Sequence, residues 1–259
     1  MAAPLRALAL VALALLASPA TASAPTGTTV LVFVDFSASI HGAERVGYQR
    51  ELERDVLPWL APGDRIVIAS IDDRTLTSFR PLAEATLPVT PPFNGWVDNV
   101  LKYRKQVKAV EENVAQARAQ LQLDVKEAFA KPLASPYTDI FSSVLLAQKL
   151  FDGDTRHKVL VLMSDMIEDY PPHKFDAMTW RAESTKKLLD ELQLKRQIAD
   201  LSGVCVYVSG ASAPRAELAR DIGRFWEEFF RRAHADFDQS RYSHVLLHWP
   251  PTKGCRRSA

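Results

Sequence analysis

Five oxygen-bearing side chains stand beside the predicted strands and helices of this chain: Asp35, Ser37, Ser39, Thr138 and Asp165. The first three form a D-x-S-x-S motif directly after the apolar run at residues 28–34. The threonine opens a helical pattern, and the last aspartate follows a second apolar run at residues 157–164. Carboxylates and hydroxyls without histidine or cysteine favour a hard cation such as Mg²⁺, or else Mn²⁺ or Ca²⁺, over zinc.

Short apolar runs alternate with amphipathic helical patterns along the chain. Strands are predicted at residues 28–34, 65–71, 157–164, 204–208 and 244–247, with a more polar edge strand at 75–82. Helices are predicted at residues 44–60, 95–130, 139–150, 179–201 and 214–235. The alternation predicts a three-layer, doubly wound α/β domain with a mostly parallel sheet and one antiparallel edge strand. Because parallel strands end at a shared edge, the five side chains are expected to converge there.

This arrangement resembles a von Willebrand factor A-type domain with its metal-ion-dependent adhesion site. Asp35, Ser37 and Ser39 match the first element of that site, Thr138 its threonine and Asp165 its last aspartate. The resemblance implies that the three hydroxyls bind the metal directly, and that the two carboxylates act directly or through water. It also implies an open coordination position that accepts a carboxylate from a partner protein. The expected function is therefore metal-dependent protein binding, with no reaction catalysed.

The chain departs from the family pattern in two places. The last aspartate is usually followed by glycine, whereas Met166 stands here, and a side chain at this position puts the loop geometry in question. The helical segment at residues 95–130 is longer than the usual connection. Two interpretations stay open for it, an extra layer over the sheet edge or a partner-docking arm beside the metal face.

The motifs of this sequence do not favour an enzyme. An aspartate-nucleophile phosphatase needs a second carboxylate two residues after its first, and position 37 is serine. The sequence has no G-x-S-x-G motif for a serine hydrolase, no H-E-x-x-H motif for a zinc enzyme and no glycine-rich phosphate loop. Two alternatives remain beside the binding module: a scaffold subunit of an envelope complex that needs no metal, and a Mg²⁺-dependent hydrolase.

Composition and charge restrict the partners. Hydrophobic residues make up 47% of the 259 positions and charged residues 24%, which is typical of a globular protein. The formal net charge is +1, so no overall field favours nucleic acid. Beyond the N-terminal segment, no apolar stretch is long enough to cross a membrane.

The N-terminal segment predicts export. Residues 1–22 combine Arg6, an apolar run at 7–17 and an A-x-A pattern ending at Ala22, as a secretory signal peptide does. We therefore expect a periplasmic or secreted bacterial protein, with one domain at residues 26–249 and a tail at 250–259. Cys205 lies within a predicted strand and Cys255 in the tail, so they form a disulfide if the tail folds back, or stay free if it does not.

Two further expectations concern individual side chains. Glu168, like other acids near strand ends, is predicted to be a solvated loop charge. The aromatic residues of the last long helix recur at helical spacing, which predicts that at least two of them pack in the core: Phe225, Trp226, Phe229 and Phe230.

Overall fold

The protein is built around one six-stranded sheet, seen in a computed structural model that describes residues 27–73, 75–95, 99–131 and 135–255. The strand order is β3-β2-β1-β4-β7-β8, and only the β2–β3 pair is antiparallel. The strands are β1 (Thr28–Asp35), β2 (Arg65–Ile71), β3 (Ala83–Thr86), β4 (His157–Met163), β7 (Val204–Ser209) and β8 (Asp236–Ser243). This is the predicted doubly wound, mostly parallel sheet with one antiparallel edge strand.

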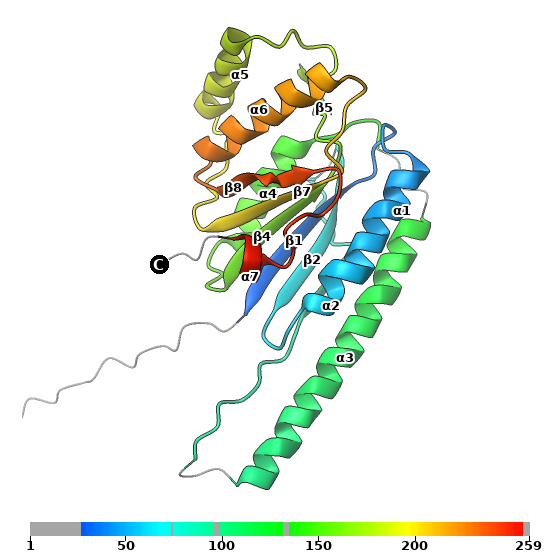
Figure 1. Ribbon diagram of the computed structural model, residues 1–259, viewed down its shortest axis with the longest axis vertical. Helices are drawn as coiled ribbons and strands as arrows, with labels where there is room; N and C mark the ends of the chain where they lie inside the picture. The colour runs from blue at the N-terminus through cyan, green and yellow to red at the C-terminus, as the bar shows by residue number, and fades with distance from the viewer. Residues whose placement is uncertain (1–26, 74, 96–98, 132–134, 256–259) are drawn as a thin grey trace, which may run out of the picture.

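Helices cover both faces of the sheet (Figure 1). On one face lie α1 (Gly42–Glu51), the π-helical turn η1 (Leu52–Val56), α2 (Leu57–Trp59) and α3 (Val100–Ala130). On the other lie α4 (Ile140–Phe151), α5 (Ala182–Leu194) and α6 (Ala216–Arg232). A two-stranded hairpin, β5 (Asp169–Tyr170) with β6 (His173–Lys174), follows β4.

The alternation of side chains along β1 explains why both faces are covered. Val30 and Val32 pack with the α1–α3 layer, whereas Leu31 and Phe33 pack with the α4–α6 layer. All four are at most 1% exposed. A continuous apolar run suits a strand buried on both sides. The predicted aromatic cluster of α6 lies in the second of these cores, and all four of its members are buried.

Two predicted strands are wrong in position. The edge strand lies at β3 rather than at residues 75–82, because the backbone of Ala83–Thr86 pairs with β2 after a loop. The last strand is β8 rather than residues 244–247. β8 is the polar edge of the sheet, with intermediate or exposed side chains at all but one position, so apolar content gave no signal for it.

The long helix α3 is both a layer and an arm. Its buried residues, Val114, Leu121, Val125 and Ala128, all lie in its C-terminal part, which packs beside α1, α2 and β3. Its N-terminal part projects beyond the end of the sheet at which β1 begins (Figure 1). The free end of α3 thus lies away from the carboxyl ends of the strands, whereas the arm interpretation had placed it beside the metal face.

The described part of the C-terminal segment, up to Cys255, packs on the domain. A short helix, α7 (Pro251–Gly254), precedes Cys255, which forms a disulfide with Cys205 of β7 with an S–S distance of 2.10 Å. The hydroxyl of Tyr207 donates a hydrogen bond to the backbone oxygen of His248, 3.2 Å away. The predicted signal peptide at residues 1–22 lies outside the described residues. Within the described part of the chain, no helix combines the length and apolar character of a membrane span.

Candidate metal centre

The D-x-S-x-S loop is held in shape by the carboxylate at its start. Asp35, the last residue of β1, is fully buried. Its Oδ1 accepts a hydrogen bond from the backbone N–H of Ser37 at 2.8 Å, and its Oδ2 accepts one from the hydroxyl of Ser164 at 2.8 Å. The hydroxyl oxygens of Ser37 and Ser39 lie 2.9 Å apart. Ser39 is exposed, so this group of oxygens is reached from solvent.

Asp165 joins the same group from the loop that follows β4. Its Oδ1 accepts a hydrogen bond from the backbone N–H of Ile167 at 2.8 Å. Burial raises the pKa of Asp165 to about 7, the negative charge of Asp35 adds to the rise, and a hydrogen bond with Ser39 opposes it. Burial also raises the pKa of Asp35, against the hydrogen bonds that it accepts. The carboxylate of Asp35 is therefore close enough to disfavour ionisation of Asp165.

Thr138 comes from a third loop, which is tied by its backbone to the other two. The N–H of Ala38 donates to the oxygen of Ser135 at 3.2 Å. Thr138 and Asp169 exchange two backbone hydrogen bonds, at 3.3 and 3.0 Å, and Thr138 is 2% exposed. The structure thus connects Asp35 with the serines and Asp165 through side-chain interactions, and ties the loop that carries Thr138 to the neighbouring loops through backbone hydrogen bonds.

Glu168 is the main residue that the sequence analysis missed. It was predicted to be solvated, but it is 1% exposed. Its Oε2 accepts hydrogen bonds from the backbone N–H groups of Ile140 at 2.8 Å and Phe141 at 3.3 Å, at the start of α4. Burial raises its pKa well above the ordinary value, and the nearby charge of Asp139 adds to the rise. Glu168 therefore links the Asp165 loop to the helix that follows Thr138.

Arg45 supports the D-x-S-x-S loop from the first helix. Its Nη2 donates to the backbone oxygens of Phe36, at 2.9 Å, and Ser37, at 3.3 Å. Its guanidinium carbon also lies 5.6 Å from the centre of the Phe36 ring. No spacing rule connects a residue on α1 to carbonyls of the preceding loop, so this contact could not be predicted from the residue pattern.

Met166 occupies the glycine position of the family pattern without disrupting the loop. It adopts a φ of 67°, in the left-handed region that glycine enters most easily. Its side chain is fully buried in the α4–α6 core, and its backbone oxygen accepts a hydrogen bond from the Trp226 indole at 2.9 Å. The conformation costs about 1–2 kcal/mol. Burial of a methionine side chain contributes about 1.5–3 kcal/mol, which offsets that cost.

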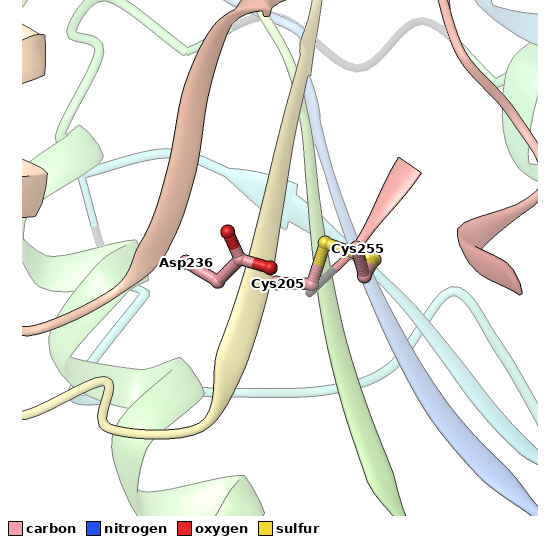
Figure 2. Close-up of side chains that lie close together, drawn as sticks. All are labelled: Cys205, Asp236 and Cys255. Carbon is pink, nitrogen blue, oxygen red and sulfur yellow. A yellow bond between two sulfur atoms is a disulfide. The ribbon is translucent and has the colours of Figure 1, made fainter. Parts of the chain in front are cut away.

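A second cluster of potential ligands lies elsewhere, around the disulfide (Figure 2). Among the described residues, one group of three cysteine, histidine or acidic side chains has ligand atoms within 4.8 Å of one another: Cys205, Asp236 and Cys255. The two sulfurs are bonded to each other and so offer no thiolate. The Asp236 carboxylate is paired with the Arg241 guanidinium at 2.9 Å. This cluster is therefore a structural crosslink beside an ion pair.

The oxygen group at the strand ends is the one whose chemistry fits a dication. It combines two carboxyls with two adjacent hydroxyls, which are ligand types that Mg²⁺ prefers. A positive ion there would favour the charged form of Asp165, against the burial and the nearby charge of Asp35 that raise its pKa. The exposed Ser39 leaves one side of the group open to a further ligand.

The chain is similar in structure to solved proteins. No protein-family model matches the chain, and no curated protein matches it. Among solved structures, the chain is similar to the von Willebrand factor type A protein from Catenulispora acidiphila, with 12% sequence identity and a TM-score of 0.38. The similarity covers 80% of this chain and 42% of the other, so the chain spans less than half the length of that protein.

Proposed function

We propose that this chain is an exported protein-binding module that recognises an acidic side chain of a partner protein through a divalent cation. The observation that carries the proposal is the convergence of Asp35, Ser37, Ser39 and Asp165 into one oxygen-rich group. When bound, Mg²⁺, or Mn²⁺ or Ca²⁺ in its place, would supply a Lewis-acidic position for the partner's carboxylate. No bond is made or broken in this function.

The residues have distinct roles in the proposal. Ser37, Ser39 and Thr138 offer neutral hydroxyls that bind the cation without cancelling its charge. Asp35 is held by Ser37 and Ser164, so it orients the loop and contributes charge directly or through water. Asp165 supplies the second carboxylate. A site with few charged ligands leaves the cation electrophilic enough to attract an acidic group.

A cleft of about 380 Å³ beside the first helical turn supports a protein partner. His41 and Glu44 line it from α1 and its N-cap, and His244 lines it from the segment after β8. Because His41 is two residues beyond Ser39, a chain bound at the cation would pass this cleft. We assign it to contacts with the partner residues next to the acidic one.

The disulfide supports export. Structural disulfides persist in oxidising compartments, and the Cys205–Cys255 bond fits a periplasmic or secreted protein. The signal-like sequence at residues 1–22 is the second reason. N-terminal sequencing of the protein purified from the cell envelope or medium tests this part, and a mature chain beginning at Ser23 is the expected result.

Thermal unfolding with and without metal tests the site. We expect Mg²⁺ or Mn²⁺ at about 100 times its dissociation constant to add about 2.7 kcal/mol of stability, which raises the melting temperature by roughly 5–10 °C. Ser39→Ala should remove the increase with little change in EDTA, because this side chain is exposed. Ser202→Ala is the matched control, since Ser202 is also exposed and bonds to an aspartate at 2.6 Å.

The alternatives predict other results. If metal leaves the melting temperature of the wild-type protein unchanged, the metal-independent scaffold replaces our proposal. If the protein releases p-nitrophenol from a phosphate ester and Ser39→Ala abolishes this release, the hydrolase replaces it. Capture of a partner that EDTA reverses and Ser39→Ala prevents would support the binding function.

A further inference from the structure

The free end of α3 carries an exposed apolar tip. Phe93 is 46% exposed, Val100 50% and Leu101 69%. The rings of Phe93 and Tyr103 are 4.8 Å apart, so the incoming segment packs against the first turns of α3. Phe93, Val100 and Leu101 are called the arm tip below. Apolar side chains gathered at a protruding end mark an interaction surface.

The first turns of α3 are also strongly basic. Four exposed cations lie there: Lys102, Arg104, Lys105 and Lys108. The described residues between Leu87 and Val110 include no acidic side chain, and the sequence of the undescribed positions 96–98 adds one, Asp98. With 3.6 residues per turn, Leu101 and Lys105 lie on one face of the helix. Lys108 lies on the same face, where its amine is paired with the Glu112 carboxylate at 3.8 Å. The apolar tip therefore continues into a basic stripe.

We propose that the arm tip binds the surface of an anionic phospholipid bilayer. Phe93 and Leu101 would enter the boundary between headgroups and acyl chains, and the basic stripe would bind lipid phosphates. Two features favour a membrane over a protein groove. The tip is a convex protrusion at one end of the molecule (Figure 1), and the described charges on the first two turns of α3, before the Lys108–Glu112 ion pair, are all positive.

The position of the arm tip determines how the domain would be oriented on a bilayer. The arm tip lies at the end of the sheet where β1 begins, whereas Asp35 and Asp165 follow the carboxyl ends of their strands (Figure 1). A bilayer bound at the tip would leave the opposite edge of the sheet facing away from the lipid. The inference is independent of the metal proposal, because no residue of the arm tip belongs to the candidate metal centre.

Vesicle flotation tests the inference in the chain beginning at Ser23, so that the apolar run at residues 7–17 contributes no lipid binding. The protein should float with vesicles of phosphatidylcholine containing phosphatidylglycerol, and far less with phosphatidylcholine alone. Phe93→Ser combined with Leu101→Ser should abolish flotation. Leu194→Ser on α5 is the control, since Leu194 is 84% exposed and should not affect flotation.

A charge variant separates the two contributions. Replacing Lys102, Arg104 and Lys105 by glutamine should lower partition onto the anionic vesicles about 100-fold, at roughly fivefold per cation. Lys126→Gln, an exposed position on the packed part of α3, should change it little. All variants should retain the wild-type melting temperature, because the replaced side chains are exposed.

Three results would overturn the inference. The first is no flotation of the wild-type protein with anionic vesicles. The second is equal flotation of the wild type and the Phe93/Leu101 double variant. The third is a wild-type dimer that becomes monomeric in the double variant without any lipid binding, which would assign the arm tip to a second copy of the chain.

Discussion

Replacing Asp165 by asparagine is expected to stabilise the metal-free protein and to abolish its response to metal. Asparagine keeps an oxygen that can accept the hydrogen bond now donated by Ile167, at 2.8 Å from Oδ1. It removes the charge that burial and Asp35 disfavour. The same change removes one of the two carboxylates of the candidate site. The variant should therefore be more stable than the wild type in EDTA and lose the increase in stability that Mg²⁺ produces.

The size of the effect follows from the raised pKa. Asp165 titrates near 7 in the folded protein and near 3.8 as a free aspartate. The difference of about three pKa units corresponds to about 4 kcal/mol as an upper value. Since the folded state holds the proton more tightly, the wild type loses this stability as pH rises from about 4 to 7. The advantage of the variant should grow over that range and level off above it.

Urea unfolding in EDTA at several pH values measures this difference. The control is Asp154→Asn. Although burial opposes it, hydrogen bonds from Thr29 and the backbone of Arg156 lower the pKa of Asp154. That variant should lose stability at neutral pH. If Asp165→Asn instead destabilises the metal-free protein at pH 7, the reasoning that burial and Asp35 disfavour the charge of Asp165 is refuted.

Three further predictions concern the scaffold around the site. Met166→Gly should lower the free energy of unfolding by about 1–3 kcal/mol in urea titrations, because the lost core side chain outweighs the relief of its positive φ. Glu168→Ala should cost about 1–3 kcal/mol for each helix amide left without its acceptor, and Glu168→Gln should retain most of the stability. Cys205→Ser should lower the free energy of unfolding by about 4 kcal/mol, the loop-closure value for a sequence separation of 50. Reduction of the disulfide in the wild-type protein should remove the same contribution and therefore lower its melting temperature.

The sequence predicted the buried layers of this fold well because their signal is local. The runs that form β1, β2, β4 and β7 are short and apolar, and they needed no tertiary context to be recognised. β3 and β8 were misplaced because their polar residues owe their strand conformation to pairing with a neighbouring strand. At such edges, backbone hydrogen bonds decide the conformation and side-chain hydrophobicity does not.

The candidate site also contains residues that could be predicted from local sequence and residues that could not. The D-x-S-x-S motif and Asp165 were found from their positions after buried strands. Glu168 was not, because its partners are backbone amides of a helix that begins 28 residues earlier in the chain. The left-handed backbone of Met166 was equally hidden, since only the packing of its side chain against the aromatic core makes a non-glycine residue tolerable there.

The disulfide between β7 and the C-terminal segment also affects whether copies of this protein can exchange strands at high concentration. Residues 205–255 form a covalently closed ring that contains α6 and the outermost strand, β8. A terminal strand that is free at one end can separate from its own sheet and pair with the sheet of a neighbouring molecule. Such exchange is a common route to domain-swapped dimers and fibres. Here the strand is anchored on both sides, so exchange would require the whole ring to open.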